Sequence, residues 1–190
     1  QNQQREKDQA LFSDFDEYLE SLNMKCVITG INDNNQERIV QLANKTNQFN
    51  LTNWRLTQQD VLAIQKNEEY ITLNGKLADK YGDNGIVSSI IAKQNGESVQ
   101  ILLWIMSCRV FKRGLEYCMW NELYKECQSR GIKVIYGSYI PSAKNQRIKE
   151  FYGELGFVKV KEDAKEDLWM LEVAEGKPVS ATKIQVEREV

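Results

Sequence analysis

The chain has 190 residues, of which 42% are hydrophobic and 27% charged, and its formal net charge is −2. This composition fits one globular domain with a short appendage at most. The slightly acidic balance argues against a nucleic-acid-binding protein. No apolar run approaches the roughly 20 residues that a membrane-spanning helix needs, so no membrane contact is expected.

The sequence contains four cysteines and no histidine. Cys26, Cys108, Cys118 and Cys127 form no CxxC pair, which favours reduced thiols and a cytoplasmic location. Without histidine, a Ser-His-Asp triad or a Cys-His dyad within this chain is excluded, and the commonest zinc ligand is missing. We therefore expect no metal site, and any proton transfer has to use Tyr, Cys, Glu, Asp, Lys or water.

The first half of the chain predicts a strand, two helices and a β-meander. A polar lead-in and a helix fall within residues 1–22, and residues 24–31 are typical of a strand. Helical patterns begin near Asn35 and Thr57. Asn-Gly pairs, which favour hairpins, separate three β-rich runs: 68–79, 85–93 and 98–107. The last run is apolar at both alternating sets of positions, which predicts a central strand covered on both faces.

The second half alternates helices with strands. Helical patterns cover about 112–130 and about 143–155, and each is ended by a glycine. Strands are expected at 132–138, 157–160 and 168–173, and the residues from Gly176 onward show no clear pattern. Three antiparallel strands followed by βαβ units predict an α+β fold, with a mostly antiparallel mixed sheet and helices on both faces.

The stretch AKNQRIKEFYGELGF, residues 143–157, resembles the penultimate helix of GNAT acyltransferases, N-x-x-A-x-x-x-Y-x-x-x-G-F. The matching positions are Asn145, Ile148, Tyr152, Gly156 and Phe157. The order of elements from 24 to 173 is also similar to that of the GNAT-like acyl-CoA N-acyltransferase fold. The resemblance implies that Asn145 supports a pantetheine arm and that Tyr152 protonates the departing thiolate, from one helix face and about 10 Å apart. The alternative is that Tyr152 and Phe157 only pack the helix onto the sheet.

The stretch SCRVFKRGLE, residues 107–116, leads from the central strand into the long helix, whose N-terminus offers free N–H groups to an anion. It resembles the GNAT loop Q/R-x-x-G-x-G/A that binds the CoA pyrophosphate, with Gly114 as the first glycine. Phe111 and Glu116 depart from that pattern, and a carboxylate in the first helical turn would repel a phosphate. The phosphate loop is therefore expected to be degenerate.

This fold brings the starts of the two helices to one edge of the sheet. Five cations lie there: Arg109, Lys112 and Arg113 precede the first helix, and Lys144 and Arg147 open the second. The surface there is expected to be positive and to fit a phosphate or an acidic protein helix. A solvated charged rim is the alternative. Cys108 lies beside Arg109 and is a candidate for contact with an acyl substrate, because a nearby cation can activate a thiol. It can equally be a packing residue.

Three segments resemble the C-terminal part of FkbH-like proteins: RIVQLANKTNQFNLTNWRLT, LADKYGDNGIVSSII and IMSCRVFKRGLE. With YIPSAKNQRIKEFYGELGF, the similarity extends from about Asp14 to Phe157. In that family a HAD-type domain takes a glyceryl unit from a phosphorylated glycerate and delivers it to an acyl carrier protein, on the way to methoxymalonyl units or tetronates. The resemblance implies two partners, the carrier protein and the HAD-type domain. It implies carrier-bound phosphopantetheine or an acyl-CoA as cofactor.

The chain lacks the HAD motif, so it looks like the C-terminal domain alone. We expect residues 1–23 to be a lead-in from a missing N-terminal domain, 24–175 to form the GNAT-like domain, and 176–190 to be a tail.

The uncharged polar run NKTNQFNLTNWRLT, residues 44–57, has two interpretations. In a GNAT-like fold it lines the acceptor side of the cleft. Its amides and hydroxyls could then hold a polyhydroxy acyl group or a pantetheine arm, through Asn47, Gln48, Asn50 and Thr52. Alternatively it is a buried, satisfied polar turn that fixes two helices, with Phe49 and Leu51 as core residues.

Two functions follow from these expectations. The first is an acyltransferase-like domain that engages a pantetheine thioester and helps load a glyceryl-type unit onto an acyl carrier protein. The second is a non-catalytic module with a degenerate CoA site, which docks the carrier protein or caps the HAD-type domain. Whether the domain is an enzyme is left open by the sequence.

Overall fold

The computed structural model describes residues 2–180 and 182–189. The strands are β1 (Met24–Thr29), β2 (Phe49–Asn50), β3 (Tyr70–Asp79), β4 (Gly82–Asn95), β5 (Ser98–Met106), β6 (Val134–Tyr139), β7 (Val158–Glu162), β8 (Asp167–Glu172) and β9 (Ile184–Arg188). The helices are α1 (Asn2–Gln9), α2 (Phe15–Ser21), α3 (Gln36–Lys45), α4 (Gln58–Gln65), α5 (Leu115–Ser129) and α6 (Phe151–Glu154). Short 3₁₀ turns are η1 (Cys108–Val110), η2 (Gln146–Ile148) and η3 (Val173–Glu175).

All strands of the described chain join one sheet in the order β7-β8-β6-β5-β4-β3-β1-β9, and β2 pairs separately with β5. Most neighbours are antiparallel, while β5–β6 and β1–β9 are parallel. The α+β class with a mixed sheet, which the sequence predicts, is therefore confirmed. The last run of the meander is also confirmed as a central strand, because β5 lies between β4 and β6 and most of its residues are buried.

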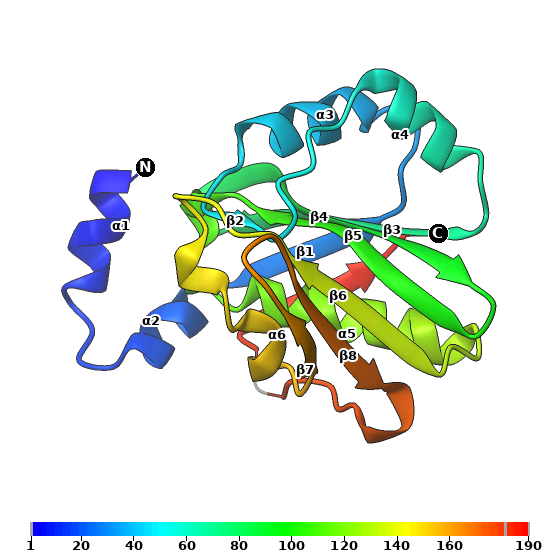
Figure 1. Cartoon of the computed structure of the whole chain (residues 1–190). Helices are drawn as coiled ribbons and strands as arrows, with labels where there is room; N and C mark the ends of the chain where they lie inside the picture. The colour runs from blue at the N-terminus through cyan, green and yellow to red at the C-terminus, as the bar shows by residue number, and fades with distance from the viewer. Residues whose placement is uncertain (1, 181, 190) are drawn as a thin grey trace.

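Helices cover both faces of the sheet, with α3 and α4 on one side and α5 on the other (Figure 1). The α3–α4 layer buries Ile39 and Val61 against Ile91 and Leu103, because apolar residues of β4 and β5 alternate between the two faces. The α5 layer packs closely on β3: a Cβ at Gly75 would lie 2.8 Å from a methionine sulfur of α5. β5 is therefore buried on both sides at the centre of the sheet.

The parallel strands β5 and β6 pair only from Ser98↔Val134 to Ile101↔Gly137 and then diverge. Beyond that point the free edge of β5 pairs with β2, a strand of two residues that the sequence does not predict. A parallel pair that separates leaves unpaired backbone groups on both strands, and these groups need other partners. The divergence of β5 and β6 is the feature that positions the candidate site.

Two further elements differ from the expectations. Residues 143–155 do not form one helix, because η2 and α6 are separate short turns joined at Lys149 and Glu150. The expected tail after Gly176 contains β9, which pairs in parallel with β1 from Met24↔Ile184 to Ile28↔Arg188. The division into lead-in, domain and tail stays a prediction, but the last strand belongs to the sheet.

Among the described residues, no helix combines the length and the apolar composition needed to cross a lipid bilayer.

Candidate functional site

We call residues 47–52, the middle of the uncharged polar run, the polar segment. It fills the divergence of β5 and β6. Phe49 pairs with Met106 and Asn50 with Ile105, and the Leu51 N–H donates to the Trp104 carbonyl at 3.2 Å. On the other side, the Ile140 N–H donates to the Leu51 carbonyl at 2.8 Å. The segment thus bridges both strands with its own backbone, where the two strands no longer pair with each other.

The Asn145 side chain fixes this segment and is fully buried. Its amide nitrogen donates to the Asn50 and Ile140 carbonyls, both at 2.9 Å. Its amide oxygen accepts from the Tyr139 hydroxyl at 3.0 Å and from the Ser142 N–H at 2.8 Å. An asparagine side chain has two donors and two acceptor positions, so all four are occupied. Its expected role as a pantetheine contact stays a prediction, and as placed it has no hydrogen bond left to offer.

The side chains of Asn50 and Thr52 make hydrogen bonds to the protein backbone in and beside this turn. The fully buried Asn50 donates to the Thr46 carbonyl at 3.1 Å and accepts from the Asn53 N–H at 2.9 Å. The Thr52 hydroxyl donates to the Leu102 carbonyl at 2.7 Å. These contacts agree with the interpretation of a satisfied polar turn for this part of the run. The expected contact of Asn50 and Thr52 with a substrate stays a prediction. Their hydrogen bonds to the backbone do not support it.

Phe49 closes the divergence with its ring. The side chain is buried and packs edge-on against Phe151, with ring centroids 5.1 Å apart. Trp104 meets Phe151 at the same separation, and Phe111 lies 6.3 Å from Phe49. The ring therefore belongs to an aromatic cluster between the sheet and α6. This agrees with the interpretation in which Phe49 is a core residue.

Tyr152 lies inside the same cluster and has no exposed surface. Its ring sits on Gly137 of β6, where a Cβ would approach ring carbons to 2.4 Å. Burial raises the pKa of the hydroxyl well above its ordinary value, and the hydroxyl has no partner among the described residues. Because residues 143–155 are not one helix, Tyr152 does not share a helix face with Asn145. Its proposed proton-donor role stays a prediction that this position does not favour.

The residues of the expected phosphate loop, just before α5, do not turn their cations toward a common anion site. Arg113 does not face solvent: its Nη1 donates to Asp79 Oδ2 at 2.8 Å, and Arg5 donates to the same carboxylate. Gly114 precedes α5 with φ of +83°, a conformation that favours glycine. Lys112 is a non-glycine residue in the left-handed region, with φ of +62°. Arg113 is thus engaged in a buried ion pair and is not turned to the surface as a phosphate contact would require.

A small cavity of about 170 Å³ lies beside the start of α5, between α5 and α6. We call it the α5–α6 cavity, and its charged lining residues are Lys112, Glu116, Arg147 and Glu154. Burial raises the pKa of Glu116, and the Glu154 carboxylate adds to this effect. Glu116 Oε2 has no hydrogen-bond partner among the described residues. Two carboxylates offset the two cations, so the cavity lacks the positive field that a pyrophosphate needs.

A second cavity, of about 740 Å³, lies on the α3 side of the same segment. We call it the basic cavity, and four cations line it: Arg38, Lys45, Arg109 and Lys144. It brings together five residues predicted from the sequence: Asn47, Gln48, Cys108, Arg109 and Lys144. The Cys108 side chain is exposed there. Gln48 and Met106 line both cavities, so the polar segment forms part of the wall between them.

Sequence reasoning missed two residues of the basic cavity, Arg38 and Lys45. They are seven positions apart in α3, about two helical turns, and therefore share one helix face. This spacing could have identified them, because both fall within a helix that the sequence predicts. What the sequence lacked was the packing that turns this face toward Arg109 and Lys144.

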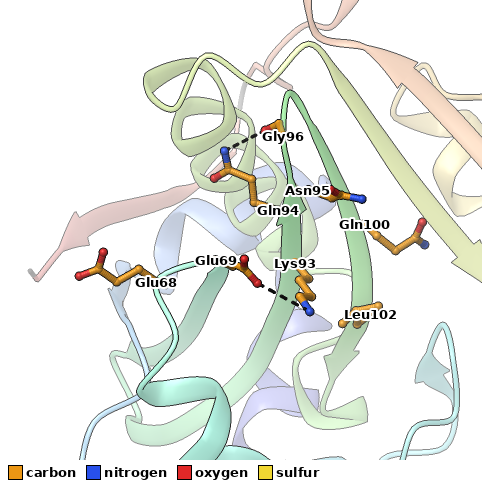
Figure 2. A pocket seen from close by; sticks show the side chains of 8 residues that line it. All are labelled: Glu68, Glu69, Lys93, Gln94, Asn95, Gly96, Gln100 and Leu102. Carbon is orange, nitrogen blue, oxygen red and sulfur yellow. Dashed lines mark hydrogen bonds and ion pairs between the residues drawn. The ribbon is translucent and has the colours of Figure 1, made fainter.

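Another hollow, of about 750 Å³, lies at the β4–β5 hairpin and involves none of the predicted site residues. Figure 2 shows Lys93 paired with Glu69, while Glu68 and Gln100 point away to opposite sides. The Lys93–Glu69 ion pair measures 3.7 Å, and Gln94 donates to the Gly96 carbonyl at 3.0 Å. Lys93 and Gln94 are thus paired within the hollow, and Gln100 donates to Ser138 outside it, so we assign no function to this hollow.

The resemblance implies coenzyme A, and its fit can be tested on three features of this structure. The edge of β5 that an extended pantetheine arm would need is occupied by residues 49–51. The start of α5 carries the buried carboxylate of Glu116 where the pyrophosphate would lie. Asn145 has no free hydrogen-bonding group. As arranged here, these residues do not fit the coenzyme.

No protein-family model matches this sequence. No curated protein matches it either.

Comparison with solved structures shows a clear likeness despite low identity. The PaiA N-acetyltransferase of Thermoplasma acidophilum, solved in complex with coenzyme A, has a TM-score of 0.62 at 12% identity, covering 78% of this chain and 99% of that one. A GNAT-family acetyltransferase of Staphylococcus aureus has a TM-score of 0.59 at 14% identity, covering 78% and 99%. The ribosomal-protein-S18-alanine N-acetyltransferase of Escherichia coli has a TM-score of 0.57 at 13% identity, covering 76% and 90%. The chain therefore has the GNAT acetyltransferase fold.

Proposed function

We propose that this chain is the acyltransferase-like C-terminal domain of an FkbH-like protein and that it docks an acyl carrier protein during loading of a glyceryl-type unit. In this role it binds the carrier and does not itself transfer the acyl group. The observation that carries the docking role is that residues 49–51 fill the divergence of β5 and β6 with backbone hydrogen bonds. An acyl-CoA has no open strand edge to bind.

The charge distribution supports a carrier protein as the partner. Arg109, Lys112, Lys144 and Arg147 are all exposed and border the two cavities that share Gln48 and Met106. They place four exposed cations along this surface of a protein of net charge −2, with Glu116 and Glu154 beside Lys112 and Arg147. Acyl carrier proteins present an acidic helix, and complementary charge steers such encounters and fixes their register. Capping of the HAD-type domain is the other docking role that this region could serve.

Calorimetric titration tests the docking role with three ligands: acetyl-CoA, an apo acyl carrier protein and its holo form. We expect the carrier to bind and acetyl-CoA not to bind. The double variant Lys112→Glu, Arg147→Glu should weaken carrier binding about tenfold or more. The exposed Lys66→Glu serves as the control for a charge change elsewhere. Absence of binding by both carrier forms would refute the docking role, as would turnover of acetyl-CoA.

Acyl transfer from an acyl-CoA is the second candidate, and one observation favours it. The Tyr152 hydroxyl is completely buried without a hydrogen-bond partner among the described residues, although buried hydroxyls are nearly always paired. Displacement of residues 49–52 would let a thioester sulfur approach this hydroxyl. If the candidate is correct, wild-type protein consumes acetyl-CoA and Tyr152→Phe, which keeps the ring and its packing, does not. A wild-type protein that leaves acetyl-CoA unchanged rules it out.

A further inference from the structure

The basic cavity holds positive charge that the protein does not neutralise. Its four cations come from three parts of the chain: Arg38 and Lys45 from α3, Arg109 from η1, and Lys144 from the loop before η2. Among the residues that the structure describes, no carboxylate lines the cavity. Within the described residues, none of the four cations has an ion-pair partner, whereas Arg113 pairs with a buried aspartate close by.

Two of the cations, Arg38 and Arg109, are close enough for one to influence the other. Burial lowers the pKa of Arg38, and the Arg109 guanidinium lowers it further. Arg38 is held in place because its Nη2 and Nε both donate to the Ile86 carbonyl, at 3.0 and 3.2 Å. A fixed cation beside a like charge, without a counter-charge from the chain, creates a field that attracts an anion.

Neutral donors lie next to these charges. The Asn47 side chain accepts from Arg55 Nη2 through its oxygen at 2.6 Å, and its amide nitrogen has no partner among the described residues. The Gln48 side chain is exposed and likewise makes no hydrogen bond with the described part of the chain. Amide donors of this kind bind hydroxyl, carbonyl or phosphate oxygens. A volume of about 740 Å³ falls within the range of small-molecule sites.

We propose that the basic cavity is a binding site for a small phosphorylated molecule, whose phosphate meets Arg38, Lys45, Arg109 and Lys144 and whose remaining polar groups meet Asn47 and Gln48. The inference rests on the charges and size of this cavity. Arg109 and Lys144 also belong to the surface proposed for carrier docking, but the two proposals name different ligands and can fail separately. A phosphate suits the site because several cations can share its oxygens.

Inorganic pyrophosphate is the probe, titrated calorimetrically into the whole protein at low salt. We expect saturable binding that weakens as salt is added, since exposed charges are screened. The double variant Lys45→Gln, Lys144→Gln should weaken binding about tenfold or more. Neither lysine side chain makes a hydrogen bond or ion pair with the described residues, so this variant should unfold at the wild-type temperature. The matched control Lys66→Gln, Lys165→Gln removes two exposed lysines elsewhere and should bind like wild type.

Malonate, a small dicarboxylate, tests whether phosphate is preferred. Tighter binding of pyrophosphate than of malonate supports the proposal, and equal binding overturns the assignment to phosphate. Undetectable pyrophosphate binding by the wild-type protein overturns the proposal. So does equal affinity of the cavity variant and the matched control.

Discussion

The two cavities on either side of the polar segment differ in volume and in the charge of their lining residues. The α5–α6 cavity lies at the helix start that the fold offers to a coenzyme phosphate, yet it is small, aromatic and offset by Glu116 and Glu154. The basic cavity lies on the α3 side, is about four times larger, and has cations without acids. The fold therefore does not decide where an anion binds, because local side-chain charge outweighs the shared backbone frame.

The wall between the cavities is the polar segment itself. Its backbone bonds to β5 and β6 and the ring of Phe49 hold the two spaces apart. Four kinds of variant therefore test the difference between the cavities. They truncate the Phe49 ring, remove the hydrogen bonds of Asn145, neutralise one cation on either side, or neutralise Glu116.

Phe49→Ala should have the largest effect, because it removes a buried ring from the aromatic cluster and joins the two cavities. We expect the free energy of unfolding to fall by about 3 to 5 kcal/mol, measured by urea denaturation. The half-exposed Phe15→Ala in α2 is the control and should cost about 1 kcal/mol or less. If Phe49→Ala does not fold, Phe49→Leu provides a milder test of the same wall. A loss no larger than that of the control would show that the ring is not part of the core.

Asn145→Ala should loosen the wall without removing its apolar side chains. Four groups lose a hydrogen bond: the Asn50 and Ile140 carbonyls, the Tyr139 hydroxyl and the Ser142 N–H. The Ile140 carbonyl keeps the Asn53 side-chain amide, and the Tyr139 hydroxyl keeps the backbone carbonyl of residue 145. Leaving buried polar groups unpaired predicts a loss of about 2 to 3 kcal/mol of unfolding free energy.

The exposed neighbour Gln146→Ala is the control for Asn145→Ala and should cost less than about 1 kcal/mol. Hydrogen exchange at Asn50 and Leu51 should become faster in Asn145→Ala alone. Unchanged exchange would mean that Asn145 does not fix the segment.

Lys144→Gln and Arg147→Gln form a matched pair across the wall, because the first residue lines the basic cavity and the second the α5–α6 cavity. We expect Lys144→Gln to weaken pyrophosphate binding about tenfold, equivalent to about 1.4 kcal/mol. Arg147→Gln should change it less than about twofold, since Glu116 and Glu154 already offset that side. Equal effects in calorimetric titrations would show that the two cavities act as one anion site.

Glu116→Gln should have the smallest effect, and its sign depends on pH. Burial raises the pKa of Glu116 in the folded state, so the ionised carboxylate destabilises the fold. The stability that the protonated group provides is fully present below the unfolded-state pKa, and it is lost as the pH rises through the folded-state pKa. Glu116→Gln should therefore raise the melting temperature near neutral pH by a shift worth about 1 kcal/mol or less.

This gain from Glu116→Gln should disappear in acid, below the ordinary pKa of a glutamate. The exposed Glu175→Gln is a control that should show no such pH dependence. Destabilisation by Glu116→Gln at neutral pH would mean that the charge benefits the helix start more than burial penalises it.

Local patterns predicted most of the scaffold. The periodicity of α3 and α5, the Asn95-Gly96 hairpin and the doubly apolar β5 appear where the sequence places them. The first expected hairpin position is wrong, because the chain turns at Lys80 and Tyr81 and Asn84-Gly85 lies within β4. The GNAT order of elements is confirmed by the solved structures. The departure at Glu116 predicts a start of α5 unsuited to a phosphate, and the burial of this carboxyl, which raises its pKa, agrees with that prediction. Each of these features rests on neighbours within a few residues, and such neighbours leave a readable spacing.

Features that depend on distant partners were not predictable. β2 is two residues long and exists because β5 and β6 diverge more than 50 residues later in the chain. β9 pairs with β1 from the opposite end of the sequence. The helix expected at 143–155 is broken because Asn145 binds the carbonyls of Ile140 and Asn50 and the N–H of Ser142, which competes with helical hydrogen bonds.

The sequence by itself determined which chemical groups are available for a site: uncharged amides, lysines and arginines but no histidine, and the carboxylate of Glu116 at a position where a phosphate loop has a small residue. Tertiary structure decided how they are used. It buried Asn145 and Tyr152, paired Arg113 with Asp79, and joined Arg109 and Lys144 to the α3 cations. The physical reason is that burial and ion pairing depend on which surfaces meet, and no local spacing records this.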